Sequence, residues 1–339
     1  MKRTPLVLLA SFLALTACQT TMKTTPPADF TSAAPRDPDF EALVPRDARL
    51  EKLAEGFDWT EGPIWRASGG YLLFSDIPRN TVYRWKEGEG LSVFLRPAGY
   101  TRPDPPGDEL GTNALVFDAQ DRLVMADHGN RQIARLDEVK FTRTTLADRF
   151  EGKRLNSPND LIFHSNGDLY FTDPSYGLRG LNQNPTKELE VNGVYRLTPA
   201  GELTLLIRDL TFPNGVALSP DEKTLYVSNS DPRRPVWMAY ELREDGSLGA
   251  GRVLFDASAL VRERKRGSPD GMTVDRNGNL FAAGPGGVLV ITPDGRHLGT
   301  IETEQVAANC TFGDDGSTLY ITADAELLRI RLNTKGARF

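Results

Sequence analysis

A pattern that recurs six times constrains the fold of this chain more than any other feature of its sequence. Each copy begins with one polar residue, continues into a short apolar strand, turns through Asn, Asp or Gly, and closes with a second apolar strand. Successive copies begin 52, 46, 55, 56 and 39 residues apart. We call the polar residues the anchors: Glu61, Asn113, Asn159, Asn214, Asp270 and Asn309. Since one hairpin cannot bury both of its faces, the copies must pack against each other.

Further strand patterns lie between the hairpins, for example at residues 82–85, 193–197 and 236–240. About four strands in a repeat of this length is typical of a propeller blade. No long helical period competes with this pattern. The sequence therefore predicts an all-β fold, a six-bladed β-propeller. The chain ends in a strand pattern at 327–332, and we expect a strand from roughly residues 48–57 to complete the last blade and close the ring.

Propeller geometry brings the anchors together. The first strand of each blade is innermost, so all six anchors are expected to point toward the axis at one face. The second strand is antiparallel and returns to that face about 14 residues later. Its end carries Asp76, Asp127, Asp173 or Asn229 in four of the copies, and we expect these residues to lie behind the anchors. His128 and Tyr176 follow closely and are predicted to lie at the mouth of the same face.

The anchors are two carboxylates and four amides, which are hard oxygen donors of the kind that calcium prefers. Magnesium demands a tighter octahedral geometry and fits less well. The alternative is that Asn, Asp and Gly at these positions are ordinary turn residues. A Glu is a poor turn residue, so Glu61 favours the metal interpretation most, together with Asn214 and Asp270. Asn159 follows them, whereas Asn113 and Asn309 are equally well explained as turn residues, or as contacts to substrate or water.

Six short motifs around the anchors resemble the gluconolactonase branch of the gluconolactonase/regucalcin (senescence marker protein) family. The resemblance runs from about residue 50 to the end of the chain. It implies a six-bladed propeller with a central divalent ion, ligands at Glu61, Asn214 and Asp270, and Asn159 as a ligand or substrate contact. It also implies hydrolysis of a lactone of the gluconolactone type. The motifs occupy residues 61–65, 157–161, 172–177, 213–216, 269–272 and 309–313.

Two positions depart from the family pattern. The animal members carry an Arg two residues before the third anchor, where this chain has Ser157. Ala114 stands where relatives often have Gly. The sugar contacts of the animal members are therefore not transferred to this chain, and Asn113, Asn159, Tyr176 and Asn309 are predicted as its own substrate contacts.

A mechanism follows as a hypothesis. The ion polarises the lactone carbonyl, and Asp270 orients or deprotonates the attacking water or, alternatively, attacks as a nucleophile. His128 is predicted as a proton shuttle; the alternative is that it only packs at the channel rim. No nucleophile elbow or nucleotide-binding fingerprint is present. A phosphotriesterase-like hydrolase and a binding propeller with a structural ion are the two other function classes, because a fold alone does not decide function.

The N-terminus predicts export. Lys2 and Arg3 precede an apolar run at residues 6–15 that is too short to cross a bilayer. The tetrad at residues 15–18 resembles a bacterial lipobox, which implies lipidation of Cys18 and, with Gln19 following, sorting to the outer membrane. An ordinary signal peptide is the alternative. We therefore predict a signal peptide at 1–18, a flexible tether at 19–45 and the propeller at 46–339, in a periplasmic, lipid-anchored protein.

Composition excludes several other classes. The net charge of −6 argues against a nucleic-acid binder, which needs a basic surface. Two cysteines cannot form a disulfide framework, and three dispersed histidines have no zinc-ligand spacing. We expect a monomer whose partners are a small lactone and, through the lipid anchor alone, a membrane.

Overall fold

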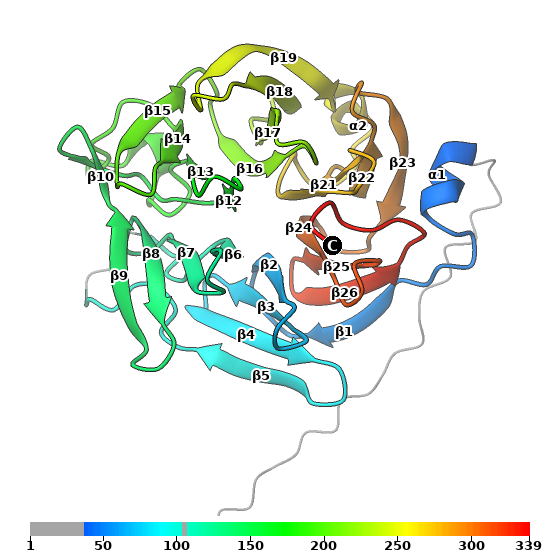
Figure 1. The fold of residues 1–339 in the computed structure, drawn as a ribbon, viewed down its shortest axis with the longest axis horizontal. Coiled ribbons are helices and arrows are strands. Elements are labelled where there is room, and N and C mark those ends of the chain that lie inside the picture. Colours follow the sequence, from blue (N-terminus) through cyan, green and yellow to red (C-terminus); the bar gives the residue numbers. More distant parts are fainter. Residues whose placement is uncertain (1–36, 104–106) are drawn as a thin grey trace, which may run out of the picture.

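The computed structural model describes residues 37–103 and 107–339. The predicted signal peptide, Cys18 and most of the predicted tether lie outside these residues. Within the described ranges the chain forms six four-stranded antiparallel sheets arranged as blades around one axis (Figure 1). The predicted six-bladed propeller is confirmed. The described residues contain no helix with the length and apolar character needed to cross a bilayer.

Each blade is a meander in which neighbouring strands pair in order from the axis outward. Blade 1 consists of β2 (Thr60–Arg66), β3 (Tyr71–Asp76), β4 (Thr81–Lys86) and β5 (Gly90–Leu95). Blade 2 consists of β6 (Leu115–Phe117), β7 (Leu123–Asp127), β8 (Gln132–Asp137) and β9 (Thr142–Ala147). Blade 3 consists of β12 (Leu161–Phe163), β13 (Leu169–Asp173), β14 (Gly193–Leu197) and β15 (Leu203–Ile207). Blade 4 consists of β16 (Pro213–Leu218), β17 (Thr224–Asn229), β18 (Val236–Leu242) and β19 (Leu248–Asp256).

Blade 5 consists of β20 (Met272–Val274), β21 (Leu280–Gly284), β22 (Gly287–Ile291) and β23 (His297–Glu302). Blade 6 consists of β24 (Ala307–Gly313), β25 (Thr318–Ala323), β26 (Glu326–Arg331) and β1 (Glu51–Glu55). A small ribbon of β10 (Arg149–Phe150) and β11 (Lys153–Arg154) follows blade 2, the 3₁₀ helix η1 (Leu181–Gln183) lies between β13 and β14, and helix α2 (Ser258–Arg262) follows blade 4.

The ring closes as predicted, because the first strand completes the last blade. β1 pairs antiparallel with β26, with Lys52 opposite Leu328 and Ala54 opposite Leu327 (Figure 1). Lys52 Nζ also bonds Glu326 Oε1 at 2.8 Å. Strands from the two ends of the propeller thus share one sheet, so neither end can separate without breaking a blade.

The predicted tether ends earlier than expected. Residues 38–43 form helix α1 (Pro38–Leu43), whose N-cap Asp37 accepts a hydrogen bond from the backbone N–H of Asp39. Phe40 and Val44 are buried against blades 5 and 6. Residues 38–44 of the predicted tether are therefore ordered against the propeller, and burial of Phe40 and Val44 stabilises this docking.

The core lies between the blades, where apolar side chains of one sheet pack on those of the next. Leu73 of blade 1 packs with Leu115 and Met125 of blade 2, for example, and Phe281 of blade 5 packs edge-on against Phe312 of blade 6. β3 shows why the sequence produces such strands: its apolar residues Leu72, Leu73 and Phe74 are all fully buried because blades cover both of its faces.

Candidate active site

The six anchors form a closed ring at one end of the channel, where neighbouring anchors are joined by contacts between innermost strands. The backbone N–H of Ala114 donates to the Asn159 carbonyl at 3.0 Å, and that of Gly271 donates to the Ala308 carbonyl at 2.9 Å. Asn309 Nδ2 donates to Glu61 Oε2 at 3.2 Å and joins the last copy to the first. The predicted convergence of the anchors is confirmed.

Glycine after an anchor permits this close approach. A Cβ atom on Gly62 would lie 2.3 Å from the Asn113 carbonyl oxygen, and one on Gly215 would lie 2.4 Å from the Asp270 carbonyl oxygen. Both separations are far below van der Waals contact, so any side chain at these positions would push two blades apart at the axis.

The ring faces a cavity of about 360 Å³. Five of the six anchors line it, and the remaining lining residues come from the loops above them. The lining contains no Lys or Arg, although it includes three carboxylates. The lining residues are Trp59, Glu61, Ile77, Glu109, Asn113, Asn159, Tyr176, Asn214, Ser230, Gly267, Ser268, Asp270 and Val306.

The two anchor carboxylates lie in an environment that disfavours their charge. The pKa of Glu61 is raised to about 8, mainly by burial and also by the neighbouring carboxylates of Asp160 and Glu109, while hydrogen bonds from Gly62 and Asn309 oppose the rise. Burial and the Glu61 carboxylate raise the pKa of Asp270 well above its ordinary value. Two buried carboxylates facing one cavity without a basic side chain are stabilised if a cation binds between them.

The amide anchors Asn113, Asn159 and Asn214 line the same cavity. Asn113 Oδ1 is buried and has no hydrogen-bond partner among the described residues. Asn214 Nδ2 donates to Ser230 Oγ at 3.1 Å, so its oxygen is turned away from that bond. An orphaned buried oxygen in a native fold calls for a partner, such as a ligand or an ion.

Residues at the ends of three second strands, Asp76, Asp173 and Asn229, bind the segments that precede the anchors. Asp173 accepts hydrogen bonds from the backbone N–H groups of Asn156 and Ser157 at 2.7 and 2.8 Å. Asn229 Oδ1 accepts in the same way from Phe212 at 2.9 Å. Each acceptor therefore fixes the two or three residues that precede an anchor, as the sequence pattern predicted for residues behind the ring.

The other predicted site residues occupy different positions. Tyr176 lines the cavity as expected and stacks on Phe212. Asn309 does not line it, because its amide is engaged by Glu61 and by the backbone N–H of Cys310. His128 was predicted at the mouth, and that position is wrong: its side chain is fully buried and does not line the cavity.

Sequence reasoning missed Glu109. This residue lies in the loop before the second anchor and lines the cavity, and its Oε2 is 2.8 Å from His128 Nε2. It escaped notice because it lies outside the repeated hairpins, in a Pro- and Gly-rich loop with no periodic signal.

Comparisons with known proteins agree with this geometry. Residues 59–325 match the family described as SMP-30/Gluconolactonase/LRE-like region. The chain is also 42% identical over 305 residues to a protein named gluconolactonase from Zymomonas mobilis, covering 88% of this chain and 85% of that one. This chain belongs to the SMP-30/gluconolactonase/LRE-like family.

Solved structures place the family resemblance in three dimensions. A structure described as a gluconolactonase from Xanthomonas campestris is 34% identical with a TM-score of 0.78, covering 92% of this chain and 99% of that one. A calcium-binding protein, regucalcin, from Agrobacterium tumefaciens is 19% identical with a TM-score of 0.67, covering 84% and 94%. The second likeness concerns the fold alone. Both solved structures thus share the overall fold of this chain.

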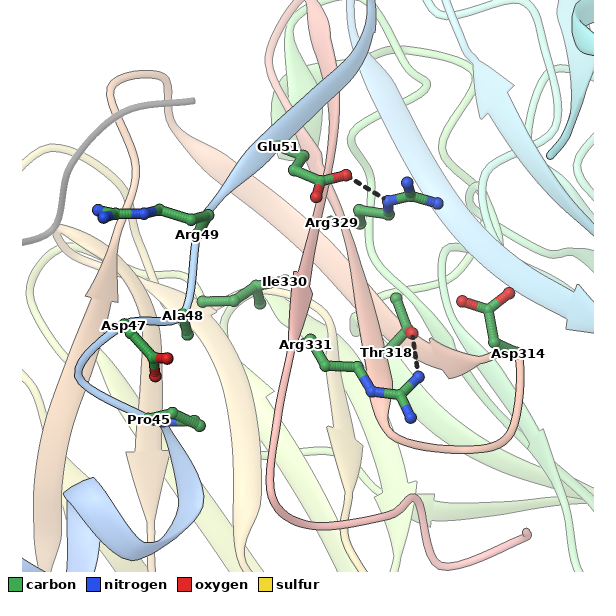
Figure 2. Close-up of a pocket in the computed structure, with 10 residues that line it drawn as sticks. All are labelled: Pro45, Asp47, Ala48, Arg49, Glu51, Asp314, Thr318, Arg329, Ile330 and Arg331. Atoms are coloured by element: carbon green, nitrogen blue, oxygen red, sulfur yellow. Dashed lines mark hydrogen bonds and ion pairs between the residues drawn. The ribbon is translucent and has the colours of Figure 1, made fainter. Parts of the chain in front are cut away.

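A larger depression of about 470 Å³ lies at the rim, between the segment before β1 and blade 6 (Figure 2). Two of its arginines are paired: Arg329 bonds Glu51 at 2.7 Å (Figure 2), and Arg331 bonds Asp315 at 2.8 Å. This depression lacks the unpaired buried groups of the channel, so the anchor cavity is the candidate site.

Proposed function

We propose that this member of the family is a divalent-metal-dependent hydrolase that opens a sugar lactone, such as gluconolactone, to its acid. The observation that carries the proposal is the closed ring of anchors, with two buried carboxylates and an orphaned amide oxygen facing one cavity. The Zymomonas relative, which is named gluconolactonase, supports the substrate class because the similarity extends over most of both chains.

The donor set fits calcium. Glu61, Asn159, Asn214 and Asp270 would hold the ion through carboxylate and amide oxygens, with water in the remaining positions. Among the described residues, no three His, Cys, Asp or Glu side chains are placed to hold a metal ion together, so an ion here would depend on the amide oxygens as well as on the carboxylates. A divalent ion in this position would polarise the lactone carbonyl and stabilise negative charge on its oxygen.

The chain's own residues supply the remaining chemistry. Asp270 is proposed to orient and deprotonate the attacking water; direct attack by its carboxylate is the alternative. Asn113, Asn159 and Tyr176, which line the cavity, are proposed to bind the lactone hydroxyl groups. Tyr176 remains a neutral donor throughout, because burial raises the pKa of its phenol.

Calcium binding and catalysis can be tested separately on the full-length protein. Calorimetric titration of calcium into metal-free protein is expected to show one site, and Glu61→Gln is expected to weaken it by at least tenfold. Hydrolysis of gluconolactone is expected to stop with chelator and return with calcium. Glu244→Gln, an exposed carboxylate in the β18–β19 turn, is the matched control and should change neither result.

Other outcomes would point to the remaining function classes. Turnover of an organophosphate without turnover of lactones would favour a phosphotriesterase-like hydrolase. Tight calcium binding without hydrolysis of either substrate class would favour a binding propeller with a structural ion.

We also propose that the protein is exported and lipid-anchored through Cys18 at the outer membrane. The support is the basic, apolar and lipobox order of residues 1–18. Metabolic labelling with a fatty-acid analogue is expected to mark the wild-type chain and not Cys18→Ser. Equal labelling of both chains would exclude this anchor.

A further inference from the structure

Glu109, which the repeat pattern did not predict, contacts the imidazole of His128. Glu109 lines the cavity with a side chain that is 37% exposed, while the imidazole behind it is fully buried. Of the three carboxylates that line the cavity, Glu61 and Asp270 belong to the anchor ring. Glu109 is the third, and it lies outside the ring.

The imidazole is fixed on both sides. His128 Nδ1 lies 3.3 Å from the Pro158 carbonyl oxygen. A Cβ atom on Gly177 would lie 2.5 Å from His128 Cδ2, so the backbone of that loop packs directly on the ring. The ring cannot rotate away without displacing this backbone, and its Nε2 atom therefore stays directed toward the cavity side.

The loop that carries Glu109 is also held in place. The backbone N–H of Gly111 donates to the Ile77 carbonyl at 2.8 Å, and that of Tyr100 donates to the Leu110 carbonyl at 2.7 Å. These bonds tie the residues directly after Glu109 to blade 1. Both segments are therefore held in place, and their positions set the short distance between Glu109 and His128.

These contacts constrain which atoms of the His128–Glu109 pair carry hydrogen. A carbonyl oxygen only accepts hydrogen bonds, so Nδ1 carries a hydrogen atom. If Nε2 carried none and Glu109 were ionised, two lone-pair atoms would face each other at 2.8 Å inside the protein. A proton carried by either Nε2 or Oε2 would remove this repulsion and stabilise the pair. The two atoms are close but are not aligned as a hydrogen bond, since Nε2 has no hydrogen-bond partner among the described residues.

We propose that Glu109 is the general acid of the reaction and that His128 is the residue that positions it; this inference rests on the proposed lactonase function. Water attacks the carbonyl carbon and loses a proton to Asp270. The bond between the carbonyl carbon and the ring oxygen then breaks, its electron pair stays on the ring oxygen, and that oxygen takes the proton held by Glu109. Proton return from Asp270 through solvent restores the pair, so lactone and water give the hydroxy acid without another reactant.

This role has a signature that a structural role lacks. An alkoxide leaving group needs a proton, since the pKa of a simple alcohol is near that of water, about 15.7. A phenolate leaves without one, because the pKa of a phenol is about 10. Loss of the general acid should therefore slow an aliphatic lactone and spare an aryl lactone.

The experiment compares gluconolactone with dihydrocoumarin, an aryl lactone, in the calcium-loaded full-length protein. Glu109→Gln is expected to lower kcat for gluconolactone about 100-fold and kcat for dihydrocoumarin less than about threefold, with similar KM values. His128→Gln should show the same selectivity with a smaller loss. Glu244→Gln is the control, and circular dichroism with calcium titration checks that each variant folds and binds the ion.

The outcomes separate this proposal from the one on which it rests. Equal losses for both lactones, a change confined to KM, or no change would overturn the general-acid role while lactonase activity stands. Wild-type protein that hydrolyses neither lactone would overturn the proposed function, and this inference with it.

Discussion

The two ends of the central channel are built from the same repeated hairpins but differ in how their buried polar side chains are hydrogen-bonded. At the end with the turns, Asp275 is fully buried and accepts hydrogen bonds from the backbone of Asn277 and Asn279 and from Thr334 Oγ1. At the anchor end, Asn113 Oδ1 has no partner and burial raises the pKa of Glu61. Asp275 at the turn end is thus satisfied by the chain's own groups, whereas the polar groups at the anchor end would be stabilised by a bound ligand.

The C-terminal tail strengthens this contrast. The backbone N–H of Ala337 donates to the Val274 carbonyl, and that of Gly336 donates to the Gly316 carbonyl, both at 2.9 Å. The tail therefore crosses the turns of blades 5 and 6 and covers part of one channel end. Only the opposite end, among the described residues, carries the anchors and their cavity. Under the proposed function, the anchor end binds the ligand whereas the turn end contributes to stability. Four measurements test this division.

The largest effect is expected from Asp270→Asn at the anchor end. The amide keeps the shape of the carboxylate but cannot accept a proton from water, so kcat should fall by about 10³-fold or more. Steady-state kinetics on gluconolactone, with thermal unfolding as a check on the fold, measure this. A near-normal kcat would remove Asp270 from catalysis.

A change in pH should destabilise the metal-free anchor end by a few kcal/mol. The folded-state pKa of Glu61 lies near 8, above its ordinary 4.5, so the protonated carboxyl stabilises the metal-free fold fully below about pH 4.5. That contribution is lost as pH rises through about 8. Denaturant unfolding at pH 5 and pH 8.5 should show the loss with chelator and little of it with saturating calcium. Glu61→Gln should lessen the loss, and an unchanged pH dependence in that variant would contradict the assignment.

Two glycine substitutions distinguish the effect of close packing on stability from the effect of backbone conformation. Gly215→Ala at the anchor end should destabilise the fold by about 3 kcal/mol, because its Cβ would meet the Asp270 backbone. Gly201→Ala in the β14–β15 turn, where φ is +86° and no atom lies within 4 Å, should cost about 1 kcal/mol. Urea unfolding measures the stability of both variants. Calcium affinity, measured by titration, should fall in Gly215→Ala alone. Equal effects would show that the two ends are equally tolerant.

The smallest effect concerns the turn end. Thr334→Val removes the hydroxyl that bonds buried Asp275 at 2.8 Å, which should cost about 1–2 kcal/mol of stability. We expect kcat for gluconolactone and calcium affinity to stay at wild-type values. A fall in kcat without unfolding would mean that the two ends are coupled, against the division described above.

The repeated pattern predicted much of this from the residues alone. Strand periodicity and turn residues are local signals, so the blade number and the ring closure by β1 followed directly. The convergence of Glu61, Asn214 and Asp270 followed as well, because a propeller places the start of every inner strand at one face. The docking of α1 did not follow, since the mostly apolar run at residues 40–44 is short and its partner surface comes from blades 5 and 6.

The loops mark the limit of sequence reasoning. His128 follows the end of β7, so its place near the anchor face was predictable, but its complete burial depends on packing by the loop that contains Gly177. Glu109 carries no periodic signal, and its approach to His128 depends on bonds to blade 1.

The residues by themselves determined the six blades, the face at which the anchors meet and the chemical type of their donor atoms, because these depend on a period of two along each strand and on a repeat along the chain. Only the tertiary structure decided which carboxylates share the cavity, which oxygen is left without a partner and which acid stands beside an imidazole. These features arise between segments far apart in sequence, where packing and burial, rather than local conformational preference, set the distances.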